Sequence, residues 1–245
     1  MGARFLTARV AGIAGILFVV ATAAPGFATG SPPDPGDPAS KFLSFVADNR
    51  SALILAQVLA MVGSFFAFFF FAKLISVLRR VGGDGNPLTM VGLISIAVVA
   101  TLAALSGVFQ VAAAFRVARG EHIDAITVQA FVDASSICGA FLGLPFAAFF
   151  TSQGLLMRAS RAPAWLGIAW IVAGALEAVG TFTVLSTTGG FSPQGAAGLI
   201  VGLLPFGLVT LATSITMLVR PGAFDEEEAV AARPLTPAAA GAGAD

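Results

Sequence analysis

Two acidic residues, Asp133 and Glu177, have side chains that could do chemistry inside a membrane, because each lies within a long apolar segment. Gln129 and Ser136 stand four residues before and three residues after Asp133, so these three side chains share one helix face. A carboxylate in hydrocarbon costs about 2.5–3.5 kcal/mol on insertion scales, so such residues face a bundle interior or a wet cavity. The expected chemistry is a proton relay or the binding of a cation.

The two carboxylates are predicted to lie in the same half of the membrane. Asp133 is six residues from the start of its segment at Thr127, about 10 Å at 1.5 Å per residue. Glu177 is twelve residues from Trp165, about 18 Å along a segment that runs the other way. If the carboxyl groups are close, they resist double ionisation and one keeps a proton near neutral pH. The predicted polar pocket consists of Asp133, Glu177, Gln129, Gln57 and Gln110.

Two functional hypotheses follow from these residues. In the first, the chain binds or moves a small molecule, ion or proton through the polar pocket. In the second, it is a structural or assembly subunit without a ligand, and each carboxylate is satisfied separately, for example Asp133 by Arg50 or Arg116.

The apolar segments predict an all-α fold, a polytopic transmembrane helical bundle. Apolar residues make up 57% of the 245 residues and charged residues 11%, against roughly 25% charged in soluble domains. The first segment contains Ala21-Thr22-Ala23, which resembles a signal-peptidase site, so its cleavage would leave five spans instead of six. The six predicted spans are 10–24, 53–77, 88–113, 127–156, 164–185 and 196–219.

Charge distribution predicts the orientation and the domains. The segments on the side of the N-terminus carry eight Lys and Arg residues and the opposite segments four, which favours cytoplasmic termini in a bacterial plasma membrane. We expect a cytoplasmic N-terminus at 1–9 and a six-helix domain at 10–219. An external loop at 25–52 should be irregular over 25–40 and form a short interfacial helix over 41–50. Residues 220–245 are expected to form a disordered acidic cytoplasmic tail.

Several classes of function are disfavoured. The sequence contains no Walker A, HExxH, GxSxG or CxxC motif, so we expect no enzyme. Cys138 and His122 are single residues of their types, which predicts no metal site and no cofactor. Zero net charge gives no indication of a nucleic-acid partner. The expected partners are membrane lipids and either another membrane protein or a second copy of the chain.

A Leu-Pro-Phe motif occurs twice, at Leu144-Pro145-Phe146 and Leu204-Pro205-Phe206. The motifs lie in spans that run in the same direction. Each proline either kinks its helix and loosens backbone groups near a site, or is a proline that membrane helices tolerate.

The segments FVADNRSALILAQVLAMVG, SVLRRVGG and APAWLGIAWIVAGAL, with Asp133 early in the fourth span, together cover about residues 40–180. This pattern resembles uncharacterised actinobacterial multi-pass integral membrane proteins of unknown function. The resemblance implies a multi-pass fold and no particular activity.

Overall fold

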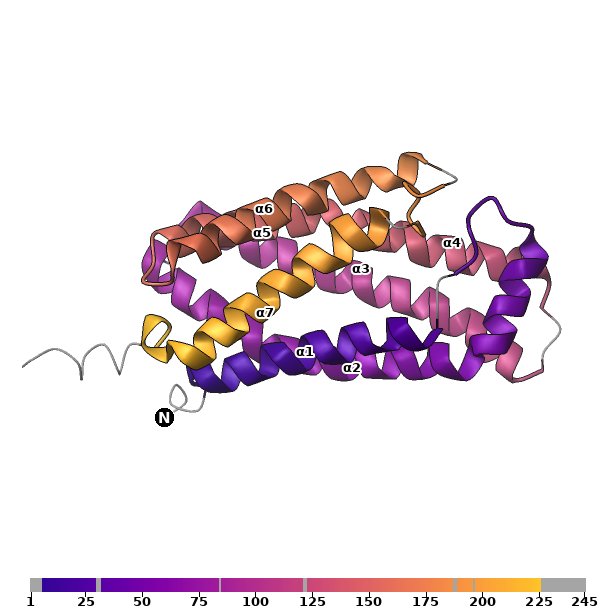
Figure 1. Cartoon of the computed structure of the whole chain (residues 1–245), viewed down its shortest axis with the longest axis horizontal. Helices are drawn as coiled ribbons and strands as arrows, with labels where there is room; N and C mark the ends of the chain where they lie inside the picture. The colour runs from indigo at the N-terminus through magenta and orange to yellow at the C-terminus, as the bar shows by residue number, and fades with distance from the viewer. Residues whose placement is uncertain are drawn as a thin grey trace, which may run out of the picture.

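A computed structural model describes residues 6–29, 32–83, 85–120, 123–186, 189–195 and 197–225. Within these ranges all regular elements are helices and there is no strand, which confirms the predicted all-α bundle (Figure 1). The α-helices are α1 (Ala8–Thr29), α2 (Ala39–Gly82), α3 (Pro87–Ala118), α4 (Ala125–Phe141), α5 (Gly143–Arg158), α6 (Ala164–Thr181) and α7 (Leu204–Val219). The short helices are the 3₁₀ turns η1 (Phe182–Leu185) and η3 (Pro221–Ala223) and the π-helix η2 (Gly198–Leu203).

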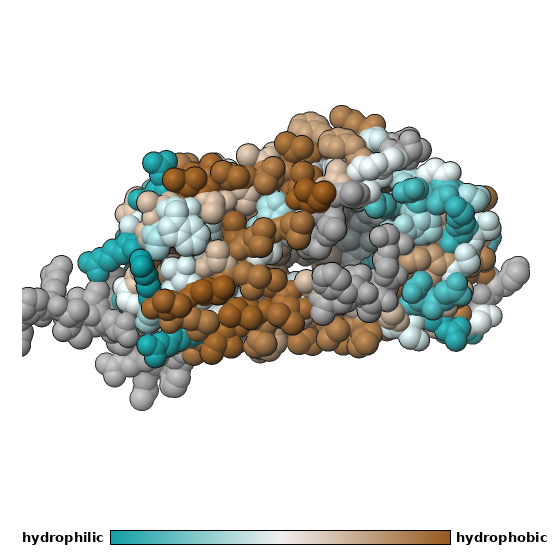
Figure 2. Space-filling model, viewed as in Figure 1, coloured by the Kyte–Doolittle hydropathy of each residue, from teal (hydrophilic) through white to brown (hydrophobic). Residues whose placement is uncertain are grey.

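Among the described residues, five helical segments are long and apolar enough to cross a membrane: Ala39–Gly82, Pro87–Ala118, Ala125–Arg158, Ala164–Leu185 and Ile200–Val219. A shorter apolar helix, Ala8–Ala23, occupies most of the first predicted span. The face of the molecule shown in Figure 2 agrees, because hydrophobic residues cover its middle and hydrophilic residues gather at its two ends. The chain is therefore a multi-pass membrane protein with five to six spanning helices.

Both ends of the described chain lie at the same end of the bundle. The backbone N–H of Ala8, the first residue of α1, donates to both carboxylate oxygens of Asp225, at 3.1 and 3.0 Å. We call this the proximal end; it also holds the α2–α3 and α5–α6 turns (Figure 1). The opposite, distal end holds the connections α1–α2, α3–α4 and α6–η2.

The distal connections are more helical than expected. Irregular structure is predicted over 25–40, but α1 continues to Thr29 and α2 already begins at Ala39. The predicted interfacial helix at 41–50 is therefore continuous with the following span, and its first turns lie across the distal end (Figure 1). Only part of α2 can lie in the hydrocarbon layer, since 44 residues span about 66 Å and the layer is about 30 Å thick. The connection between the spans predicted at 88–113 and 127–156 is also shorter, because α3 ends at Ala118 and α4 begins at Ala125.

Both helices that contain a Leu-Pro-Phe motif are interrupted just before it. The helix formed by α4 and α5 breaks at Leu142, whose N–H bonds to the carbonyl of Gly139 instead of continuing the α-helical pattern. The other motif directly follows the π-helix η2, which ends at Leu203. A proline has no N–H to donate to the carbonyl four residues earlier, so Pro145 and Pro205 each leave one backbone bond unmade.

An aromatic core fills the proximal half of the bundle. Trp170 and Phe150 lie at its centre, with ring centroids 5.0 Å apart, and the Trp170 indole N–H donates to Thr213 Oγ1 at 2.9 Å. Rings from five helices contribute to this core: Phe18, Phe70, Phe71, Phe146, Phe149, Phe150, Trp170 and Phe206. A second, smaller core near the distal end consists of Phe42, Val46, Leu53, Ala113, Ala114, Val128 and Val132.

The first helix is packed into this bundle. A Cβ atom on Gly15 would stand 2.1 Å from Ser214 Oγ and 2.6 Å from Phe70 Cδ2, so the α1 backbone nearly touches both α7 and α2. Ala8 and Ala11 on the same helix are fully buried. Helices that approach this closely need small residues at the contact, which explains the glycine.

Candidate functional site

Pairs of polar side chains join the helices in the distal half. Gln57 Nε2 on α2 donates to Gln110 Oε1 on α3 at 2.5 Å. Ser106 Oγ on α3 donates to the Ser135 carbonyl on α4 at 2.9 Å. The two glutamines, which the sequence predicts at a similar depth, therefore lie together, and one hydrogen bond joins their amides.

Asp133 is half-buried on α4, with Gln129 one turn away and also half-buried. Its hydrogen-bond partner is Gln194, whose Nε2 approaches Asp133 Oδ1 at 3.4 Å and Ser136 Oγ at 3.0 Å. Gln194 belongs to a non-helical turn between η1 and η2, outside the segments whose periodicity can be analysed. Sequence reasoning missed it for that reason.

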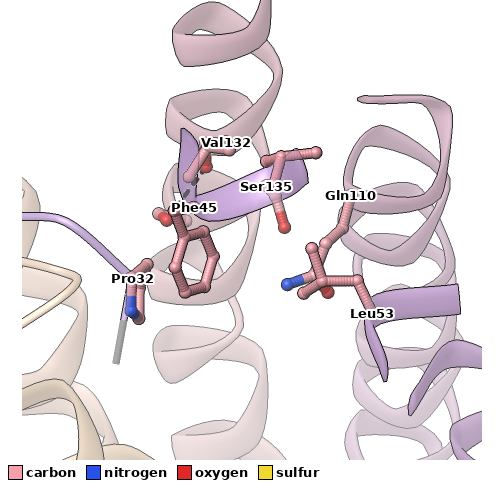
Figure 3. Close-up of a pocket in the computed structure, with 8 residues that line it drawn as sticks. Pro32, Phe45, Leu53, Gln110, Val132 and Ser135 are labelled. Carbon is pink, nitrogen blue, oxygen red and sulfur yellow. Dashed lines mark hydrogen bonds between the residues drawn. The ribbon is translucent and has the colours of Figure 1, made fainter. Parts of the chain in front are cut away.

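A small pocket of about 40 Å³ lies beside these residues. In Figure 3, Ser135 and Gln110 point toward one another across it, and Phe45 from the start of α2 closes one side. A water molecule needs at least roughly 10–15 Å³ of such space, so the pocket has room for a few waters and not for a larger substrate. Its lining residues are Pro32, Phe45, Val46, Leu53, Gln110, Val132, Ser135 and Ser136.

Glu177 lies elsewhere, at the α5–α6 contact. Its side chain is only 3% exposed, and Oε1 has no hydrogen-bond partner among the described residues. A Cβ atom on Gly143 of α5 would stand 2.2 Å from the Glu177 carbonyl oxygen and 2.3 Å from Thr181 Oγ1. The Thr181 hydroxyl, one turn from Glu177, is likewise buried and has no described partner. The α5 backbone therefore packs tightly on α6 at this level, and the buried Glu177 carboxyl group has no described hydrogen-bond partner at Oε1.

The structure separates the two carboxylates that the sequence predicts in one pocket. Gly143, which packs on the backbone of Glu177, comes ten residues after Asp133, and ten helical residues rise about 15 Å. Asp133 therefore belongs to the distal group with Gln129 and Gln194, while Glu177 is an isolated acid deeper in the bundle.

Within the described residues, no three His, Cys, Asp or Glu side chains gather in a way that could hold a metal ion. Cys138 is half-buried as a free thiol on α4, and His122 lies outside the described residues. The polar side chains described at the site carry carboxyl, amide and hydroxyl groups.

These features define a multi-pass helical membrane protein with one acid buried in its bundle. No family model, no curated protein and no solved structure matches the chain. The functional argument therefore depends on the geometry of the site.

Proposed function

We propose that this membrane protein moves a proton or a small monovalent cation across the membrane by binding it at Glu177, which the ion reaches from water through the distal polar residues. The observation that supports this proposal is the burial of the Glu177 carboxyl group with Oε1 unpartnered among the described residues. An intramembrane acid in such surroundings is by default a functional residue.

The cost of an ionised Glu177 supports the same conclusion. A charged side chain at the centre of a membrane helix costs about 2.5–3.5 kcal/mol on insertion scales. The elements packed against Glu177 offer little compensation, because α7 contains no ionisable residue and α5 contains only Arg158. Arg158 is fifteen residues, about 22 Å, from Gly143. A proton or a bound cation at Glu177 would remove this cost.

The distal polar residues provide the entrance. Glu177 is eight residues from Leu185 at the distal end of its span and thirteen from Ala164 at the proximal end, so the distal water is nearer. Along the membrane normal, the space between that water and the Glu177 carboxyl group contains Asp133, Gln129 and the pocket beside Gln110. Waters held there would carry protons or hydrate a cation on its way in.

The site sits in a bacterial plasma membrane in this proposal, with both termini cytoplasmic, so the distal end faces outward. Reporter fusions at Gly83 and Ser160 test the orientation, because both residues belong to proximal turns. A cytoplasmic signal at both positions is expected. A periplasmic signal at either position would reverse the orientation.

The central experiment measures ion movement in vesicles. The purified chain is reconstituted in phosphatidylcholine and phosphatidylglycerol vesicles that contain a trapped pH-sensitive dye, and a pH gradient is imposed with choline, sodium or potassium as the cation. Flux should fall to the level of protein-free vesicles in Glu177→Gln, since the amide cannot exchange a proton. Asp133→Asn should lower the flux by less. Ser64→Ala, which removes an exposed hydroxyl that bonds only to the carbonyl of Ala60 on its own helix, should leave the flux unchanged. Equal flux in the wild type and Glu177→Gln would refute the proposal, whereas acceleration by sodium or potassium would identify the cation.

A second candidate function is supported by the paired amides. A hydrogen bond between Gln57 and Gln110 joins α2 to α3, and such bonds hold membrane helices together without a ligand. In this case the chain is a structural or assembly subunit that contacts another membrane protein or a second copy, and no catalysis is involved. Purification in a mild detergent would then give a stoichiometric complex, together with no Glu177-dependent flux.

A further inference from the structure

The carboxylate of Asp133 has a single hydrogen-bond donor and no ion pair among the described residues. Arg50 and Arg116, the basic partners that the sequence allows, form no ion pair with it. The donor is Gln194 Nε2, which lies 3.4 Å from Asp133 Oδ1, beyond the usual N–H···O range of about 2.7–3.2 Å. A carboxylate at membrane depth is costly unless a positive group compensates it, and this one lacks such a partner in the described chain.

The hydroxyl of Ser136 offers only lone pairs to the same position. Its proton is donated to the Val132 carbonyl on its own helix, at 3.0 Å. Its oxygen accepts from Gln194 Nε2, also at 3.0 Å. One amide nitrogen therefore lies beside both the Asp133 carboxylate and the Ser136 hydroxyl, which are three residues apart on one face of α4.

The other end of the Gln194 amide is an acceptor without a donor. Gln194 Oε1 is buried and has no described hydrogen-bond partner. A half-turn about the last side-chain bond exchanges Nε2 and Oε1, and this torsion is broad and roughly two-fold. After that turn, oxygens of Asp133, Ser136 and Gln194 surround one point, and none of them donates a proton to it.

The neighbouring polar contacts of the distal half are composed differently. Gln57 Nε2 donates to Gln110 Oε1, and Ser106 Oγ donates to the Ser135 carbonyl, so each contact joins one donor to one acceptor. Around Asp133, in contrast, two acceptors share a single amide donor and a third acceptor has none. This excess of oxygen acceptors is the composition of a cation site.

The pocket of about 40 Å³ adjoins these side chains. Ser136 is part of the pocket lining and is also the residue that Gln194 contacts. Ser135 and Gln110 face the same pocket from α4 and α3 (Figure 3). The few waters that fit there would supply the remaining oxygen ligands of a bound ion.

The ligand set indicates the class of cation. Carboxylate, amide and hydroxyl oxygens suit hard cations, whereas softer metals prefer thiolate or imidazole ligands. Divalent cations are usually held by more than one carboxylate, but Asp133 is the only acidic residue of α4. Its single negative charge matches a cation that carries one positive charge.

We infer that Asp133, Ser136 and Gln194 form a second ion site, the distal cation site, which binds a hard monovalent cation such as sodium. The Gln194 amide turns its oxygen toward the ion when the ion binds. As the first position of a transported ion, the site rests on the proposed function. Its binding does not require Glu177, which lies deeper in the bundle on α6, and can therefore be measured without ion flux.

Sodium binding to the purified chain tests the distal cation site. Radioactive sodium is equilibrated with the full chain in detergent at constant ionic strength, with choline as the balancing cation. The wild type is compared with Glu177→Gln, in which an ion at Glu177 no longer contributes. Glu177→Gln should still bind one sodium ion per chain with a saturable curve. Gel filtration checks that each variant is folded.

Further variants are made in the Glu177→Gln background. Asp133→Asn should weaken sodium binding by about tenfold or more, because it removes the only charge of the site. The matched control is Asp48→Asn, the same change at an exposed acid near the beginning of α2, and it should leave the affinity unchanged. Gln194→Glu supplies a second carboxylate and should add calcium binding, which covers the case in which Asp133→Asn does not fold.

Two results would overturn the distal cation site. The first is the absence of sodium binding in Glu177→Gln, which would mean that Asp133 holds no metal cation. The second is an equal loss of affinity in Asp133→Asn and Asp48→Asn, which would mean that sodium responds only to the overall charge.

The outcomes also separate this site from the proposed function. Sodium binding that needs Asp133, together with a flux that does not need Glu177, would keep the distal cation site and reject ion movement through Glu177. A Glu177-dependent flux, together with no sodium binding in Glu177→Gln, would keep the proposed function and reject the distal cation site.

Discussion

Lys73 on α2 donates a hydrogen bond to the carboxylate of Asp225, which lies 152 residues further along the chain. The same carboxylate accepts the first backbone N–H of α1, from Ala8. One acidic side chain therefore ties together the beginning of the first helix, the second helix and the end of the described chain.

Replacing Asp225 should destabilise this junction. Asp225→Ala should lower the free energy of unfolding by about 1.5–3 kcal/mol, the usual range for hydrogen bonds to charged groups, since both partners are mostly buried. Thermal unfolding in detergent measures the change. The matched control is Lys41→Met, which removes the exposed Lys41–Asp37 pair and should cost at most about 1 kcal/mol. Equal effects at the two sites would show that the junction contributes no more than a surface ion pair.

The close contact of α1 gives a second prediction. Gly15→Ala should cost about 1–3 kcal/mol, because the added methyl group overlaps Ser214 and Phe70. Gly207→Ala is the control, since its nearest heavy atom would be 3.9 Å away, an ordinary contact. We expect the intact mass of the purified protein to retain residues 1–23, because α1 is part of the packed bundle. A mass without those residues would mean that the bundle has five spans.

The glutamine pair should behave as a helix contact. Gln57→Leu and Gln110→Leu should each destabilise the bundle, because each leaves one amide without its partner. The double variant should be more stable than the sum of the single losses predicts, with a coupling energy of about 0.6–1.7 kcal/mol in a double-mutant cycle. A coupling energy of zero would mean that the two amides act independently.

Asp124 caps α4 outside the membrane and makes a pH-dependent contribution. The Thr127 hydroxyl, 2.6 Å away, and the Thr127 backbone N–H hold the pKa of the Asp124 carboxyl below its ordinary value of 3.8. A lowered pKa in the folded state means that the stabilisation is complete above pH 3.8 and is lost as the pH falls through the folded-state value. The difference in melting temperature between wild type and Asp124→Ala should shrink over that window. Asp124→Asn, which caps without titrating, should show no such loss.

The hydrophobic pattern of the sequence was sufficient to predict the helices. The position of each polar residue along its predicted span was sufficient to predict which half of the membrane it lies in. The long apolar runs predict the bundle, and the depth of Gln57 and Gln110 predicts a level at which they do meet. Depth alone did not predict which residues face each other. Asp133 and Glu177 lie in the same predicted half, but their separation depends on how α4, α5 and α6 pack, which a single helix does not encode.

The other residues of the site could not be predicted from the sequence, because their roles also depend on how the helices pack. Gln194 lies in a turn without a periodic pattern, and Gly143 becomes important only because Glu177 and Thr181 pack on it. The repeated Leu-Pro-Phe motif was visible in the sequence. The contact between Phe146 and Phe206 was not, since it joins two helices that are not neighbours in the chain.

The Asp225 junction also has a consequence for how the protein is made. α1 leaves the ribosome before α2, whereas the residues that complete its contacts, Ser214 and Asp225, are synthesised only after α6. During translation, α1 therefore lies in the membrane before these contact residues are present, and one of its faces lacks its final partner. Insertion of the helices and final assembly of the bundle are consequently separate events in time, and the second can finish only after residue 225 has been added.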